Sequence, residues 1–193
     1  MPLSDLLVFI RPFAFLTIRH PTSRMPLWTN WLLPLFTVAA ALALFAFLGD
    51  AVNVYAKDGL LERCLAFTQT LAGFYIAALA AVSSFNSPHL DRLMPGTPPT
   101  MSVFHNGGYQ PVPLTRRRFL TSMFAYLTAL SLTFSVVAIG AVVLAPVLKE
   151  AISSAVPYLH WIGLGLSLFA LFQMVWVTLW GLFYLGERML TPD

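Results

Sequence analysis

Four apolar stretches, each long enough to cross a lipid bilayer, constrain this chain more than any other feature. They cover residues 31–49, 64–85, 119–147 and 158–185. A spanning helix needs about 20 apolar residues, because each residue adds about 1.5 Å of length. The central turns of these stretches contain no Asp, Glu, Lys or Arg. The pattern predicts an all-α integral membrane protein with four transmembrane helices.

The composition agrees with a membrane domain. Hydrophobic residues make up 58% of the 193 residues and charged residues only 10%, whereas a soluble domain has about 25% charged residues. The length suits a single membrane domain, residues 1–193. The one cysteine, Cys64, cannot form an internal disulfide and begins an apolar stretch, where a small buried residue is expected.

Short polar links predict how the spans pair. Residues 50–63 join the first two spans and residues 149–157 join the last two, and links of this kind suit antiparallel neighbours. We therefore expect two helical hairpins joined by a central loop, residues 86–118.

Helix packing is predicted along one face of the second span. Gly73, Ala77 and Ala81 recur every four residues and let a neighbouring backbone approach closely. Gln69 and Gln173 are the most polar residues within the spans. They either form hydrogen bonds between helices or line a pore or ligand site.

The N-terminal segment, residues 3–24, is apolar but too short to span, because Arg11–Pro12 interrupts it. It lacks a signal-peptide pattern, and we expect no cleavage. A helix can lie in the plane of the membrane interface here, with Arg11, Arg19 and Arg24 at the headgroups. A helix packed on the bundle explains the pattern equally well.

The central loop has two parts with different patterns. Residues 86–99 are rich in proline, which favours an extended path over a helix. Residues 100–114 alternate around Asn106–Gly107, which is typical of a small β-hairpin. Pro111 and Pro113 restrict the second arm to an edge strand.

Three consecutive arginines, Arg116, Arg117 and Arg118, end the central loop. They can anchor the chain at anionic headgroups, dock an acidic partner or contact nucleic-acid phosphates. No aromatic interleaving supports the last alternative, so direct nucleic-acid binding is not expected. The loop before them is the better contact surface, and the candidate partner-binding residues there are His89, Asp91, Arg92, Phe104, His105 and Tyr109.

The basic residues predict the orientation, since Lys and Arg accumulate in short cytoplasmic loops. One side holds eight of them: Arg11, Arg19, Arg24, Arg92, Arg116, Arg117, Arg118 and Arg188. The other side holds three: Lys57, Arg63 and Lys149. We expect both termini and the central loop in the cytoplasm, and the protein in an inner (plasma) membrane.

The sequence offers little for catalysis. His89, Asp91 and His105 share one loop, but no metal-ligand spacing or catalytic motif joins them. The spans carry no charge of the kind that marks proton relays and ion paths, which disfavours a pump or transporter. We expect no enzyme activity, no metal and no cofactor.

The architecture resembles the small four-span membrane subunit of the Kiwa bacterial anti-phage defence system. The segments that carry the resemblance are FTQTLAGFYIAALAAV, LMPGTPPT and PLTRRRFL. The resemblance implies a homo-oligomeric membrane sensor that holds a cytoplasmic, DNA-engaging effector at the membrane.

Two functions follow from the sequence. The first is a non-enzymatic membrane scaffold or sensor that oligomerises and binds a soluble cytoplasmic effector, with anionic lipid at its arginines. The alternative is a holin-like or oligomeric pore. The small-residue helix faces and the two intramembrane glutamines favour this alternative, whereas the absence of intramembrane charge weakens it.

Overall fold

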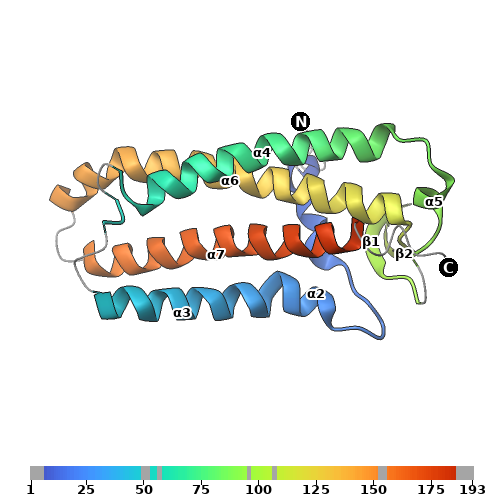
Figure 1. Ribbon diagram of the computed structural model, residues 1–193, viewed down its shortest axis with the longest axis horizontal. Coiled ribbons are helices and arrows are strands. Elements are labelled where there is room, and N and C mark those ends of the chain that lie inside the picture. Colours follow the sequence, from blue (N-terminus) through green and yellow to red (C-terminus); the bar gives the residue numbers. More distant parts are fainter. Residues whose placement is uncertain are drawn as a thin grey trace.

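The computed structural model describes residues 7–48, 53–55, 58–94, 97–105, 108–151 and 156–185. Long helices run side by side, and a small two-stranded sheet lies at one end, which we call the hairpin end (Figure 1). The elements in chain order are η1 (Leu7–Thr17), α2 (Met25–Leu27), η2 (Trp28–Leu32), α3 (Leu33–Leu48), α4 (Leu60–Ser84), α5 (Pro88–Asp91), β1 (Thr100–His105), β2 (Gly108–Pro113), α6 (Arg116–Ala151) and α7 (Val156–Phe183).

The four predicted spans are confirmed as long apolar helical segments. Those in the described part of the chain that can cross a membrane are Met25–Leu48, Leu60–Ser84, Arg116–Ala145 and Tyr158–Phe183. The first span begins six residues earlier than the sequence pattern placed it, because α2 and η2 continue directly into α3. α6 also continues past Pro146 to Ala151, since a proline in a membrane helix can remove one hydrogen bond without ending the helix.

The packing of the helices differs from the predicted pair of helical hairpins. α3 packs along α7, α7 packs along α6, and α6 packs along α4. The first two spans are therefore not packed neighbours, although the last two are. The link between α3 and α4, residues 49–59, allows this arrangement, because an extended residue reaches about 3.3 Å and the two helices can diverge.

The buried side of α4 explains its choice of neighbours. Thr68, Ala72 and Tyr75 are buried along one stripe of α4. Tyr75 Oη and Thr178 Oγ1 lie 2.6 Å apart and join α4 to α7. The stripe therefore faces the last two spans rather than the first.

An aromatic cluster at the hairpin end holds η1 against the bundle. The Phe15 ring lies 5.2 Å from Tyr126, 6.1 Å from Phe119 and 6.5 Å from Trp180, measured between ring centroids. Phe15 is only 1% exposed. Of the two arrangements expected for the N-terminal segment, the structure shows packing on the bundle, while Ile10 and Arg11 on the other side of η1 are exposed.

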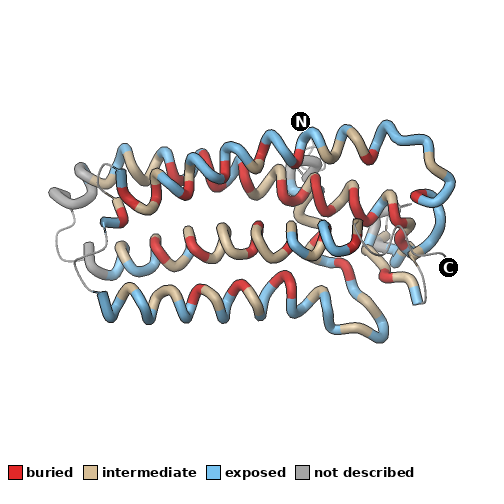
Figure 2. Tube along the Cα trace, viewed as in Figure 1, coloured by how far each residue is buried: buried red, intermediate tan, exposed pale blue. Residues whose placement is uncertain are grey.

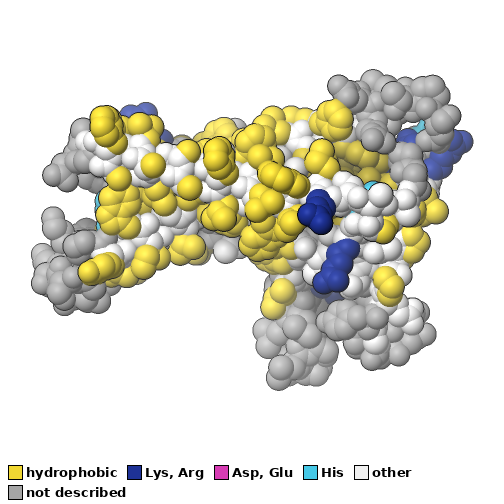
Figure 3. All heavy atoms as spheres, turned by 90° about the horizontal axis from the view of Figure 1, so that it is seen from below, with side chains coloured by type: hydrophobic (Ala, Val, Ile, Leu, Met, Phe, Trp, Pro, Cys, Tyr) yellow, Lys and Arg dark blue, Asp and Glu magenta, His cyan; other side chains and the backbone are white. Residues whose placement is uncertain are grey.

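The outer surface of the helices is apolar, as a lipid environment requires. Buried residues follow the inner sides of the helices, and the outer sides are exposed (Figure 2). Side chains such as Phe36, Phe47 and Val136 are more than two-thirds exposed. Hydrophobic side chains cover the narrow part of the molecule, and Lys and Arg side chains appear mainly toward the broader hairpin end, with a smaller group at the opposite end (Figure 3).

The predicted β-hairpin is confirmed. β1 and β2 pair antiparallel from Thr100↔Pro113 to His105↔Gly108, and the tip residues, Asn106 and Gly107, lie outside the described residues. The proline-rich segment before the hairpin, residues 86–99, was expected to be extended, yet residues Pro88–Asp91 form one helical turn, α5. Pro88 stands in the first turn of α5, where a missing N–H costs nothing.

Candidate functional site

Three segments that are distant in sequence hold the base of the hairpin. Arg19 and Thr100 exchange two backbone hydrogen bonds, of 3.0 and 2.9 Å, so the end of the η1 segment joins the outer edge of β1. Leu93 and Thr115 form a second bridge beside it. Leu114, fully buried, donates from its N–H to the Pro99 carbonyl at 2.9 Å. The hairpin therefore leaves the bundle from a fixed base.

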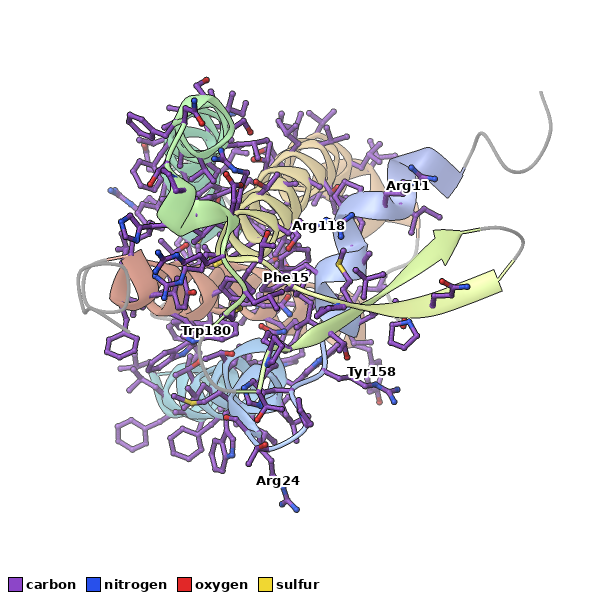
Figure 4. The ribbon with its side chains drawn as sticks, turned by 90° about the vertical axis from the view of Figure 1, so that its right-hand side faces the viewer. Arg11, Phe15, Arg24, Arg118, Tyr158 and Trp180 are labelled. Atoms are coloured by element: carbon purple, nitrogen blue, oxygen red, sulfur yellow. The ribbon has the colours of Figure 1, made fainter. Side chains whose placement is uncertain are left out.

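The hairpin lies across the helix axes rather than along them. Seen from its own end of the molecule, it projects sideways past the helices beside η1 (Figure 4). In Figure 1 the same strands are seen nearly end-on. If the helices cross a membrane, the hairpin therefore extends roughly parallel to the membrane surface.

The outer edge of β1 can accept another strand. In an antiparallel pair, residues that bond the partner strand alternate with residues whose N–H and C=O point away from it. The backbone N–H and C=O of Thr100 point away from β2, because they form hydrogen bonds with Arg19 instead. Ser102 and Phe104 occupy the alternate positions that follow, so their backbone groups point to the same outer edge. Among the described residues, only Arg19 pairs with this edge.

The outer edge of β2 is different, because prolines occupy it. Pro113 faces Thr100 and Pro111 faces Ser102 across the pair. These are the positions whose backbone points away from β1, and proline has no N–H to offer there. The hairpin thus has one edge that lacks two donors and one edge whose donors and acceptors at Ser102 and Phe104 point outward.

Arg117 fastens the loop to the second span. Its Nε donates to Asp91 Oδ1 at 2.7 Å, its Nη1 to the Val82 carbonyl at 2.7 Å, and its Nη2 to the Phe85 carbonyl at 2.8 Å. The last carbonyls of a helix have no partner within it, and a guanidinium is well suited to bond several of them at once. The hydrogen bond from Arg117 also lowers the pKa of the Asp91 carboxyl.

The three consecutive arginines thus occupy different environments. The Arg116 side chain is buried, and the Arg117 side chain bonds the end of α4 and Asp91. The Arg118 side chain is exposed, as are Arg11, Arg19 and Arg24 among the other predicted membrane anchors. In Figure 4 the Arg24 side chain extends away from the helices.

The candidate partner-binding residues all lie at the hairpin end. His89, Asp91 and Arg92 are exposed on and beside α5. Phe104, His105 and Tyr109 lie in the paired strands β1 and β2, and the structure describes only their backbone. Two residues that the sequence reasoning missed are Ser102, on the open edge, and Thr100, at the base of that edge.

Some of the predicted helix-packing residues are buried and others are exposed. Gln173 is buried, whereas Gln69, Gly73 and Ala77 are exposed on α4 and Ala81 is partly exposed. A Cβ added to Gly73 would meet no atom within 4 Å. This small-residue face therefore does not contact the chain's own helices and is open to another molecule or to lipid.

Gln173 makes a contact that the sequence did not predict. Its Nε2 donates to the backbone carbonyl of Asn30 at 2.9 Å, which links α7 to η2. Pro34, four residues after Asn30, has no N–H for the usual helical bond to this carbonyl. Local widening into the π-helical turn Trp28–Leu32 accompanies the missing bond.

A groove opens beside this π-helical turn. It has a volume of about 310 Å³ and lies between the end of the η1 segment and the start of the first span. We call it the Arg19–Asn30 groove; its polar and aromatic lining residues are Arg19, His20, Ser23, Arg24, Asn30 and Trp31. The Asn30 side chain is buried, and its Oδ1 has no hydrogen-bond partner among the described residues.

The fold and the hairpin end define the class: a multi-pass membrane protein built on four apolar helices, with a small antiparallel hairpin at one end. Comparison with protein-family models, curated proteins and solved structures finds no match for the chain. In the described part of the chain, no three His, Cys, Asp or Glu side chains come together as a metal site.

Proposed function

We propose that the protein is a non-enzymatic membrane scaffold or sensor that holds a soluble partner at the membrane surface. The hairpin is the contact element in this proposal, and the partner adds a strand to the outer edge of β1. Strand addition gains affinity from backbone hydrogen bonds and specificity from alternate side chains.

The observation that carries the proposal is the difference between the two edges of the hairpin. Exposed sheet edges are a hazard for aggregation, and proteins often block them with proline. Here Pro111 and Pro113 occupy two of the three outward positions of β2, and Tyr109 occupies the third, while Ser102 and Phe104 leave β1 open. An open edge opposite one that lacks two donors, on a hairpin with a fixed base, suits a specific strand partner.

The distribution of basic residues favours one side of the membrane for the hairpin. The basic residues that predict a cytoplasmic location include Arg19, Arg92 and Arg118, and all three lie at the hairpin end. We therefore propose a cytoplasmic hairpin in an inner (plasma) membrane, and a soluble cytoplasmic effector as the partner. The resemblance to the Kiwa membrane subunit favours the same kind of partner, in an anti-phage role.

Self-association is part of the proposal. The exposed face of α4 combines Gly73 and Ala77, which permit close helix approach, with Gln69, which can form a hydrogen bond between helices. A second copy of the chain packed on this face would present several hairpins side by side and increase the avidity for the partner.

The proposal is tested by replacing residues 100–113 with a glycine-serine linker of equal length. Soluble proteins captured by the solubilised wild type should be lost from the variant, while a variant with the linker in place of residues 149–155 should retain them. Identical capture by all three proteins would contradict the proposal. The same purified protein in liposomes should release no trapped dye; release would favour the pore instead.

A further inference from the structure

The Arg19–Asn30 groove has the chemistry of an anion site. Arg19 and Arg24 line it, and none of the described residues that line it is acidic. Arginine pairs with phosphate through two parallel hydrogen bonds. A volume of about 310 Å³ lies at the lower end of the range for ligand sites and suits a small ligand group.

Other polar groups in the groove add hydrogen-bonding capacity. His20 Nδ1 accepts from the N–H groups of Thr22 and Ser23, at 3.2 and 2.9 Å. A neutral His20 therefore carries its proton on Nε2, which is a donor. Asn30 is only 2% exposed and its Oδ1 has no partner among the described residues. Asn30 also lines the groove, so a rotation of its side-chain amide would let a donor on a bound ligand satisfy this oxygen.

The surroundings of the groove point to a lipid. Leu27 and Trp31, at its edge, are 50% and 46% exposed. The next turns of the first span expose Leu35 and Phe36, so an apolar helix face leads away from the groove. A headgroup in the groove would place its acyl chains along this face, as the bilayer requires. A soluble phosphate or an acidic peptide would make no contact with this apolar face.

We propose that the Arg19–Asn30 groove binds the headgroup of an anionic phospholipid that also carries hydroxyl groups, the chemistry of phosphatidylglycerol. Arg19 and Arg24 pair with the phosphate, and a headgroup hydroxyl donates to the Asn30 side chain. Arg19 belongs to both sites, but it bonds the hairpin through its backbone, which Arg19→Gln leaves in place, so failure of either proposal leaves the other intact.

Native mass spectrometry of the detergent-solubilised protein tests the proposal, with phosphatidylglycerol and phosphatidylcholine titrated separately. The wild type should prefer phosphatidylglycerol. The double variant Arg19→Gln/Arg24→Gln should bind it about 30-fold more weakly, because two arginine contacts at a lipid surface are lost. Arg11→Gln/Arg118→Gln is the matched control, since it removes two exposed arginines that do not line the groove.

Two further measurements separate the alternatives. Asn30→Ala should weaken phosphatidylglycerol binding about fivefold, because the headgroup hydroxyl loses its acceptor; unchanged binding would overturn this seating of the headgroup. Glycerol phosphate should not displace the lipid at concentrations where phosphatidylglycerol competes. Equal displacement would assign the groove to a soluble anion, and equal losses in the two double variants would overturn the site.

Discussion

Gln173 Nε2 lies 2.9 Å from the backbone oxygen of Asn30 and donates a hydrogen bond that joins the last span to the first. The Asn30 carbonyl needs this donor, because Pro34 occupies the position from which a helical N–H would come. One side chain thus satisfies a backbone group at the point where the first span widens into a π-helical turn. The same turn forms a wall of the Arg19–Asn30 groove.

Replacing Gln173 with leucine should therefore destabilise the bundle by about 1 kcal/mol, a typical value for a hydrogen bond between membrane helices. Thermal unfolding in detergent measures the effect. Thr133→Val is the control and should change stability little, because Thr133 is exposed on α6.

A double-mutant cycle tests the role of Pro34. Pro34→Ala supplies an N–H to the Asn30 carbonyl, so the cost of Gln173→Leu should shrink in that background. An equal cost in both backgrounds would mean that the hydrogen bond does not compensate for the proline.

Arg117 should be required for order at the end of α4. Arg117→Lys keeps the charge but cannot bond Val82, Phe85 and Asp91 together, so hydrogen exchange across residues 82–91 should accelerate. Arg118→Lys, at an exposed position, should leave exchange there unchanged. Faster exchange in both variants would assign the effect to arginine chemistry in general rather than to this contact.

The Asp91–Arg117 contact should depend on pH in one direction. Folding lowers the pKa of Asp91, chiefly through the hydrogen bond from Arg117. The contact therefore stabilises the fold above the carboxyl's ordinary pKa and is lost as pH falls through the lowered value. Protection of residues 82–91 should decline in that acidic range, and Asp91→Asn should remove this part of the pH dependence. A decline of the same size in the variant would trace it to another group.

Gly73 should matter for self-association and not for the fold. No atom lies within 4 Å of a Cβ added there, so Gly73→Leu should preserve helix content while blocking a close approach by a second copy. Mass photometry in detergent should show smaller particles for this variant. Gly140→Leu, at another open glycine on α6, should leave the particle size unchanged. Smaller particles for both variants would contradict self-association through the exposed face of α4.

The hairpin should be reached only from the cytoplasm. The chain has one cysteine, buried Cys64, so single cysteines can be introduced at exposed positions after Cys64→Ala. Ser102→Cys should react with a membrane-impermeant maleimide only after the membrane is opened, and Tyr158→Cys, near the opposite end, should react in intact spheroplasts. The reverse pattern would contradict the orientation.

The spans and the hairpin could be predicted because each has a local pattern. Apolar runs without charge define the helices, and alternation around Asn106–Gly107 defines the strands. The neighbours of each helix could not be predicted. The length of a link limits how far apart two consecutive helices can lie, but it does not determine which helices pack together. For the same reason, the packing face of α4 was placed on Gly73 rather than on Thr68 and Tyr75.

The contacts of the candidate site could not be predicted from the sequence for a different reason. Arg117 looks like its neighbours in sequence, and only the fold brings the last carbonyls of α4 to it. Pro34 lies four residues after Asn30, but a first span predicted to begin at residue 31 leaves Asn30 outside the helix. An earlier start would have indicated a missing hydrogen bond at Asn30.

The central claim is that a partner adds a strand to β1, and proline substitution tests it most directly. Ser102→Pro removes an N–H from the open edge without removing a bond to β2, as Pro111 does on the opposite edge. Pro111→Ala is the matched control, which restores an N–H on the other side. We predict that soluble proteins captured by the wild type and by Pro111→Ala are lost from Ser102→Pro. Undiminished capture by Ser102→Pro would contradict strand addition at this edge.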